Sequence, residues 1–209
     1  GQNIELNANS STTIDALNLG AALAVGGGTV GISAAGAGGN STNTVRNTVE
    51  AYVMAGSTLS TTSSGAIKLT ATDVDVSNAK TVATSISFAA GAVGVGVGVS
   101  AALAKNDIAN TVRAYSDNST INSAGNAELT ATASPSITAL AVAATFSVSA
   151  SPVGAALSGA GADSQNSINN TVEAHIVGGS ATAAGNISLN AAETGSITAD
   201  VGSGALSAG

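Results

Sequence analysis

Hydrophobic and polar residues alternate along much of the chain, and the alternation recurs. In four segments Ile or Ala, then Leu, then Ala occupy every second position, and each segment begins with a glycine. The segments are residues 1–8, 65–71, 125–131 and 185–191. A hydrophobic period of two is typical of a half-buried β-strand, and the leading glycine is expected in the turn before it. The chain is therefore predicted to be rich in strands, with a turn at Gly1 before the first.

A second recurring segment, Asn-Thr-Val-x-Ala, sets the length of the repeat. It begins the seven-residue stretches 47–53, 110–116 and 170–176, at intervals of 63 and 60 residues. Self-similarity at such a period is typical of stacked or solenoidal architectures, in which each unit buries its apolar face against the next. We therefore interpret residues 1–209 as one repetitive segment without an internal domain boundary. It divides into a partial unit 1–46, units 47–109 and 110–169, and a partial unit 170–209.

Equivalent positions of the second segment form a candidate structural ladder. The ladder residues are Asn47, Val49, Glu50, Tyr52, Asn110, Val112, Arg113, Tyr115, Asn170, Val172, Glu173 and His175. If whole repeats stack directly, Glu50, Arg113 and Glu173 form a column of alternating charge, worth roughly 0.2 to 1 kcal/mol per cross-strand pair. If each repeat instead makes about three rungs of roughly 20 residues, these side chains lie about 14 Å apart and interact weakly. The sequence leaves both arrangements open.

Each unit also contains a run of low polarity. The runs cover residues 17–37, 86–104 and 137–162. Between residues 93 and 99 valine alternates with glycine, so one face of a strand is bare and lets another backbone approach closely. Alternate glycines weaken a helix by about 0.5 to 1 kcal/mol each, and we expect no transmembrane span here. An apparent insertion at residues 73–76 is taken to explain the longer interval.

Composition narrows the function classes. Aromatic residues make up 2% of the chain and Gly numbers 26, so a well-packed core must be thin. Charged residues are 8% of the chain and the formal net charge is −7, which argues against binding to nucleic acid. A hydrophobic content of 44% argues against disorder. The absence of cysteine removes disulfides and thiolate chemistry.

Few residues suggest reactive chemistry. His175, the single histidine, replaces Tyr52 and Tyr115 at the equivalent position and is interpreted as a ladder residue. Asp73 and Asp75 share one side of a strand and are candidate calcium ligands, although two ligands are too few for a complete site. The other acidic residues are scattered, and no glycine run continues into Gly-Lys-Ser/Thr. We predict no enzyme activity, no catalytic residue and no cofactor, with calcium as the one ion to consider.

Two motifs resemble a known group of proteins. The pattern Ser-Thr-Ile-x-Ser-Ala-Gly-x-x-x-Leu-x-Ala at residues 119–131 and the recurring Asn-Thr-Val-x-Ala-Tyr resemble β-strand repeats of giant bacterial exoproteins of the filamentous haemagglutinin and leukotoxin-like adhesin type. The resemblance implies a right-handed parallel β-helix or related all-β solenoid at the cell surface, serving as a stalk, adhesin or fibre. The alternative is a wide stacked-sheet layer with one repeat of about 60 residues per layer.

These observations predict a structural role outside the cell. The leading hypothesis is an extracellular fibre or stalk segment that associates with itself, head-to-tail or laterally, through strand ladders and apolar faces of small residues. The second hypothesis is a cell-surface adhesin whose polar ladders bind glycans. A third, an ice-binding or membrane-active solenoid, rests on the Thr-rich and apolar faces. The expected partners are thus other copies of this chain and surface glycans.

Overall fold

The computed structural model describes residues 2–209 and contains thirteen β-strands and no helix among these residues. Gly1, the expected turn residue, lies outside the described residues. In chain order the strands are β1 (Ile4–Gly26), β2 (Val30–Val45), β3 (Thr48–Val53), β4 (Thr58–Ser60), β5 (Ile67–Ala90), β6 (Val93–Ile108), β7 (Thr111–Ser123), β8 (Ala127–Ala133), β9 (Ser136–Ala150), β10 (Val153–Ile168), β11 (Thr171–Ala183), β12 (Ile187–Glu193) and β13 (Ser196–Ala208). The predicted all-β solenoid class is confirmed.

Strands of successive repeats pair in parallel, and the paired residues are one whole repeat apart. Ile4 in β1 pairs with Ile67 in β5, which pairs with Ala127 in β8. The pairs build sheet A (β1, β5, β8, β9, β12, β13), sheet B (β2, β6, β10) and sheet C (β3, β4, β7, β11). The chain therefore completes one layer per repeat, as in the alternative with about 60 residues per layer. The arrangement with three rungs per repeat is wrong.

Residues 73–76 are not an insertion. Asp73 pairs with Ala133 and Val76 pairs with Ser136, so the register of β5 against its neighbours does not change there. The apparent break has two local causes. Ser77 takes the inward position that isoleucine holds in the layers on either side. Pro135, which has no N–H, separates β8 from β9, whereas β5 runs through.

The three extra residues of the longer interval lie in the loops around β4. Val53 pairs with a residue 63 positions on, Ser60 with one 62 positions on, and the carbonyl of Gly65 accepts from the N–H 60 positions on. Ala55 and Ser63, in the two loops that flank β4, have positive φ values of 62° and 50°. The additional length is thus looped out at the surface while the ladders continue in register.

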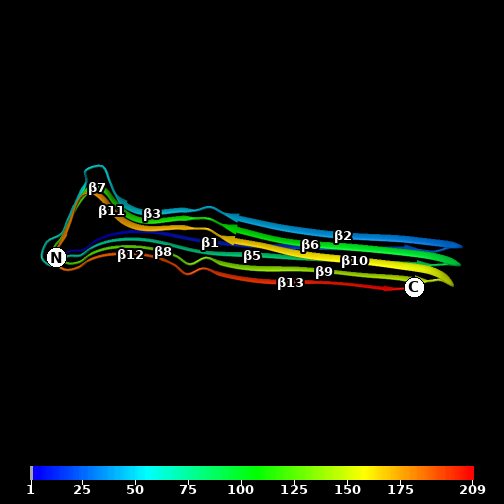
Figure 1. The fold of residues 1–209 in the computed structure, drawn as a ribbon. Coiled ribbons are helices and arrows are strands. Elements are labelled where there is room, and N and C mark those ends of the chain that lie inside the picture. The colour runs from blue at the N-terminus through cyan, green and yellow to red at the C-terminus, as the bar shows by residue number, and fades with distance from the viewer. Residues whose placement is uncertain (1) are drawn as a thin grey trace.

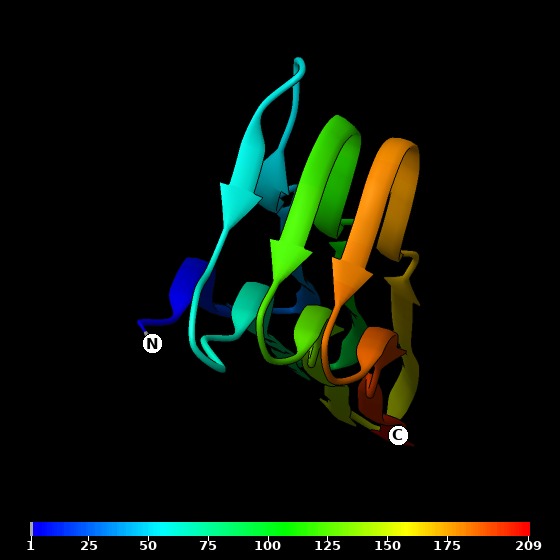
Figure 2. The same ribbon diagram turned by 90° about the vertical axis from the view of Figure 1, so that its left-hand side faces the viewer.

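Each layer is long and has two unlike halves. In Figure 1 sheets A and B run side by side to a narrow end at the right, whereas sheets A and C diverge at the left. Figure 2, seen from that left-hand end, shows successive layers side by side, from cyan at the left through green to orange at the right. We call the narrow half the blade; it comprises residues 17–38, 80–103, 140–161 and 200–208. The rest is the wide half.

The wide half has a conventional core. Its inward-facing positions hold branched aliphatic side chains, and the largest are fully buried. They are Ile67, Leu69, Val112, Ile121 and Leu129. Outward positions on the same strands carry Lys, Glu, Arg and Thr. This is the usual alternation of a sheet with one face in water.

The blade has a core of very small residues, so its two sheets lie close together. Ala83, Ala102, Ala141 and Ala143 belong to its buried apolar cluster. Further toward the tip, glycine, serine and threonine replace alanine on the inner faces. Close packing of such side chains requires a short distance between the sheets.

One glycine shows how close the approach is. A Cβ atom at Gly20, on the inner face of β1, would clash with the carbonyl O of Gly38, while a Cβ at Gly38 meets nothing. We expect Gly20→Ala to lower the free energy of unfolding by about 1–3 kcal/mol through overpacking. Gly38→Ala is the matched control and should be neutral or stabilising by about 0.4–1 kcal/mol. Urea unfolding compares them, and equal effects would contradict the close contact.

Candidate functional site

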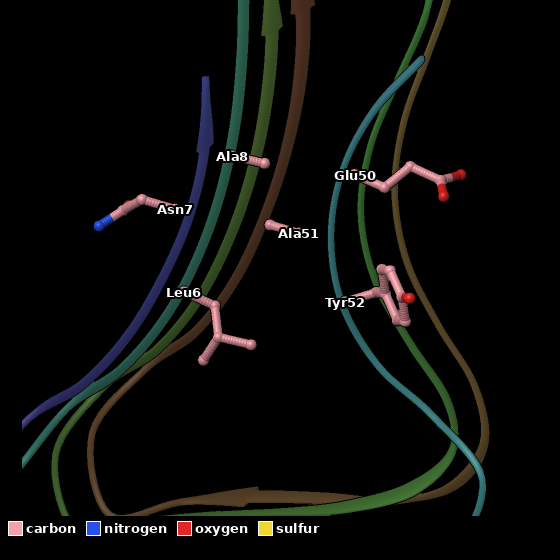
Figure 3. A pocket seen from close by; sticks show the side chains of 6 residues that line it. All are labelled: Leu6, Asn7, Ala8, Glu50, Ala51 and Tyr52. Atoms are coloured by element: carbon pink, nitrogen blue, oxygen red, sulfur yellow. The ribbon is translucent and has the colours of Figure 1, made fainter. Parts of the chain in front are cut away.

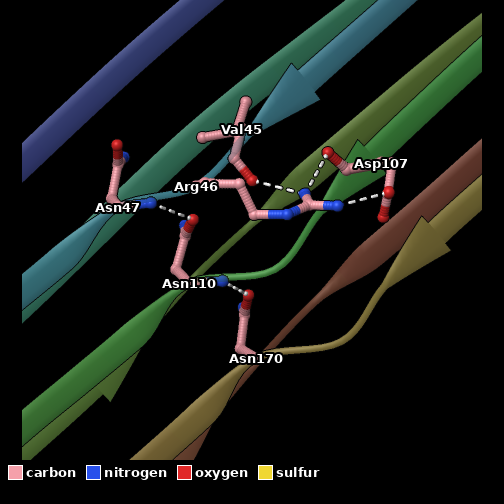
Figure 4. A network of polar contacts seen from close by, with 6 residues as sticks. All are labelled: Val45, Arg46, Asn47, Asp107, Asn110 and Asn170. Carbon is pink, nitrogen blue, oxygen red and sulfur yellow. Dashed lines mark hydrogen bonds and ion pairs between the residues drawn. The ribbon is translucent and has the colours of Figure 1, made fainter.

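The asparagines of the predicted ladder occupy the corner where sheet B passes into sheet C. Asn47, Asn110 and Asn170 lie directly before β3, β7 and β11. The backbone N–H of Asn47 donates to Oδ1 of Asn110, and the N–H of Asn110 donates to Oδ1 of Asn170, each at 2.8 Å (Figure 4). The side chains thereby satisfy donors that the strand break leaves free, as buried backbone groups require.

An arginine reinforces the same corner. Arg46 donates to the carbonyl O of Val45 at 2.7 Å, and to the carbonyl O and carboxylate of Asp107 at 3.1 and 2.5 Å (Figure 4). It therefore joins the first layer to the second. The ion pair is half exposed, so its net contribution is small, about 0–1 kcal/mol. The sequence analysis did not single out Arg46 or Asp107.

The two aspartates lie inside the layer beside this corner. Asp73 is 1% exposed and Asp75 is 0% exposed. The side-chain amide of Asn110 donates to one oxygen of each carboxylate, at 2.5 Å for Asp73. The amide of Asn47 donates to both oxygens of Asp75 at 3.3 Å, and the N–H of Thr12 donates to its Oδ1 at 3.2 Å. Amide donors thus hold two buried acids side by side.

This arrangement does not fit calcium. Calcium takes six to eight oxygen ligands, whereas the groups that surround these carboxylates are mostly N–H donors. Of the four oxygens of this carboxylate pair, Oδ1 of Asp73 alone lacks a hydrogen-bond partner. No cluster of three or more His, Cys, Asp or Glu residues occurs in the described part of the chain. We assign the pair a structural place in the asparagine corner.

The outward positions of sheet C form two further columns. Arg113 lies between Glu50 and Glu173, with nitrogen–oxygen distances of 3.4 and 2.8 Å. Two residues further along, the rings of Tyr52, Tyr115 and His175 stack with centroids 5.2 Å apart. The register brings these residues together because each pairs directly with its equivalent.

The valines of the predicted ladder face the opposite way. Val49 and Val112 are buried in the wide half, and Val172 packs against the same cluster from the last layer of sheet C. They are core residues, so the polar groups of the predicted ladder lie in the outward columns and in the asparagine corner.

Two columns escaped the sequence analysis. Asn43, Asn106 and Asn166 form a chain of side-chain hydrogen bonds of 3.0 and 2.8 Å inside the layer. Lys68 pairs with Glu128 at 3.1 Å on the outer face of sheet A, and this contact holds the pKa of Glu128 below its ordinary value. Both columns were visible as equivalent positions of the repeat. The sequence left open whether equivalent positions stack directly, and these columns depend on direct stacking.

The hollow in Figure 3 is the uncovered end of the stack. Leu6, Ala8 and Ala51 point into the interior of the first layer, and Glu50 and Tyr52 point away from it. Its walls are the same inward positions that later layers bury. Nothing in its lining resembles an acid–base pair or a nucleophile with its base.

No protein-family model matches this sequence, and no curated protein or solved structure matches it either. Residues 2–209 contain no helix long and apolar enough to cross a membrane. What the columns do chemically is to join one layer to the next through amide, ionic and ring contacts.

The asparagine corner makes a testable contribution to stability. Asn110→Ala removes two donors from buried carboxylates and the acceptor of the Asn47 N–H. Hydrogen bonds to charged groups contribute about 1.5–3 kcal/mol each, so we expect a loss of about 2–5 kcal/mol in the free energy of unfolding. Asn122→Ala, at an exposed position of β7, is the control. A loss no larger than that of the control would refute the role of the corner.

The buried acid pair should make stability depend on pH. Burial raises the pKa of the Asp73 carboxyl above 3.8, and the neighbouring Asp75 carboxylate raises it further, against donors that lower it. A raised folded-state pKa means that the folded protein gains stability as the pH falls through that pKa.

Asp73→Asn should therefore raise the melting temperature at pH 7, and its advantage should shrink as the pH approaches 4. Asp200→Asn, at an exposed position, serves as the control. Thermal unfolding between pH 4 and pH 8 measures both. An advantage of Asp73→Asn that grows toward low pH would contradict the assigned direction.

Proposed function

We propose that this chain is a segment of an extracellular structural fibre or stalk, in which the layers follow one another along the fibre axis and copies of the chain associate. The observation that supports the proposal most directly is the unbroken register. In all three sheets a residue pairs with its equivalent one repeat away, so hydrogen-bond ladders run the full height of the stack.

Such ladders suit a protein that bears load. A pull along the axis acts at once on all backbone pairs between two layers, and those pairs extend through the blade and the wide half. The asparagine corner and the outward ionic and aromatic columns add side-chain links at the same junctions. Stability in stacked repeats is a sum of repeat and nearest-neighbour terms, so more layers extend the rod without a new design.

The outer strand β1 offers a way for copies to join. It runs over 23 residues without a proline and carries only Glu5 and Asp15 as charges. Natural proteins usually protect such an edge with proline, lysine or inward-pointing charge. The unprotected edge supports self-association through strand pairing.

The adhesin alternative has less support. Sugar-binding faces commonly use an aromatic ring lying flat at the surface, but Tyr52, Tyr115 and His175 direct their ring faces at one another. The absence of cysteine and the low charge agree with an exported surface protein and do not distinguish a fibre from an adhesin.

Electron microscopy and fibre diffraction test the proposal. We expect concentrated protein to form filaments with a meridional reflection near 4.8 Å, because the strands lie across the axis. Ala16→Lys places a charge on the inner face of the edge strand β1 and should shorten the filaments. Thr70→Lys, at an outward position of β5, which is paired on both sides, should leave them unchanged. Rods that stay monodisperse at every concentration and bind glycans would favour the adhesin.

A further inference from the structure

The blade reverses the usual placement of polar and apolar side chains. Its inner faces carry hydroxyl groups: Ser100 and Thr145 share a hydrogen bond of 2.7 Å, and Ser33 and Ser87 share one of 2.6 Å. Between these hydroxyls lie Gly96 and Gly98 of β6, which contribute no side chain to the interior. The interior of the blade is therefore small and partly polar.

The outer faces of the blade are apolar. Even in the two middle layers, which have a neighbour on both sides, Ile86 is 47% exposed, Phe146 40%, Val99 54% and Leu103 45%. Residues 81–104 and 129–162 contain no charged side chain. Outward positions from Val93 to Leu103 of β6 are all Val, Ala or Leu. Contiguous exposed apolar surface of several hundred Å² normally marks an interaction site.

In the blade, the outer face of sheet A is not only apolar but also uneven. Leu23, Ile86, Phe146 and Leu206 pair into one ridge across the four layers. The neighbouring outward column, two residues earlier on each strand, is Ala21, Thr84, Ala144 and Gly204. The small side chains of this column form a groove, and the hollow lined by Thr84, Ile86, Ala144 and Phe146 lies between the two columns.

We infer that the sheet A face of the blade docks on the same face of a second copy of this chain. A two-fold axis that runs parallel to the columns, between the ridge and the groove, places the ridge of each copy over the groove of the other. A contact of this kind is isologous, so the same patch serves both partners. Face-to-face sheets of aliphatic side chains pack about 10 Å apart.

The size of the face suits such a dimer. The four outward columns that begin at Leu19, Ala21, Leu23 and Val25 of β1 lie about 6.6 Å apart and together occupy about 26 Å along the strands, and four strands span about 19 Å across the ladder. The face thus covers about 500 Å², and a pair of faces buries about 1,000 Å² in total, the lower bound for a specific interface. The charges nearest this face, Lys80 and Asp200, lie at its base and stay in water.

A protein partner fits the blade better than lipid. The outermost strands of the described stack, β1 and β13, each have an unpaired backbone edge. Water satisfies these groups beside a face-to-face dimer, whereas hydrocarbon cannot, and open sheet edges are not found in lipid. Docking of faces covers the apolar side chains and leaves the edges free for the axial growth of the proposed fibre.

This inference deepens the proposed structural role by assigning the lateral contact, and sedimentation velocity of the whole chain tests it. We expect a reversible dimer at micromolar concentration. Ile86→Lys with Phe146→Lys should weaken dimerisation at least about tenfold, because each copy would bury two unpaired charges. Thr70→Lys with Thr130→Lys, at outward positions of β5 and β8 in the wide half, is the matched control and should dimerise like the native chain.

A second measurement avoids disruptive variants. The chain has no cysteine, so Thr84→Cys introduces a single thiol into the groove. A short bismaleimide should join two Thr84→Cys chains in high yield and two Thr70→Cys chains poorly. Equal yields, or a native chain that stays monomeric at 100 μM, would overturn the inference. Monomers that still grow into single filaments with the 4.8 Å repeat would leave the proposed function intact.

Vesicles of neutral phosphatidylcholine test the remaining alternative, which is that the blade face binds lipid. We expect the native chain to stay in the supernatant after sedimentation with these vesicles. Co-sedimentation of the native chain, lost in Ile86→Lys with Phe146→Lys and kept in Thr70→Lys with Thr130→Lys, would assign the face to lipid and overturn docking of a second copy.

Discussion

Parallel pairing in register is the constraint from which the rest of the molecule follows. Each layer lies about 4.8 Å above the last, and every side chain faces its equivalent in the next repeat. Equivalent side chains of successive layers therefore contact one another, and each column needs residues that can pack against their own kind or against an opposite charge. Asparagine does so by passing hydrogen bonds upward, tyrosine by stacking, and the Glu50 position by changing sign at Arg113.

The same pairing allows one layer to contain two halves in which polar and apolar side chains are placed oppositely. In the wide half, Leu69 and Ile121 face inward and the outer surface carries charged side chains, as in a sheet with one face in water. In the blade, glycine and serine face inward while Ile86 and Phe146 face outward. Backbone hydrogen bonds between layers are the same in both halves, because they do not depend on which side chains face inward. The strand period of two is thus retained from end to end, while the environment of each face changes.

Much of the fold follows from the repeat. The recurrence at residues 47, 110 and 170 predicted the strands and the equivalent positions, and the stacking of Glu50 on Arg113 was one of two stated arrangements. The number of rungs per repeat could not be predicted, because alternation does not reveal where the chain closes a layer. The insertion assigned to residues 73–76 was wrong because Ser77 replaces an expected isoleucine and imitates a change of register.

The candidate site was less predictable for a related reason. Asp73 and Asp75 were recognised as a pair, yet which face they occupy depends on the strands opposite, and only the fold shows that Asn47 and Asn110 meet them there. Likewise the alternation of valine and glycine in β6 does not say which of the two faces inward. Small residues pack inside because the opposing sheet is close, and that distance is set by many positions at once.

The blade core has an energetic consequence for assembly. Burying an alanine or serine removes far less apolar surface from water than burying a leucine, at about 25 cal/mol per Å². The inner faces of the blade therefore contribute little hydrophobic stabilisation, while ordering long strands costs about 1–2 kcal/mol per residue in backbone entropy. The apolar surface that could offset this cost lies on the outside. Since a partner that binds only the folded form stabilises it by mass action, covering that surface would couple the folding of the blade to its association.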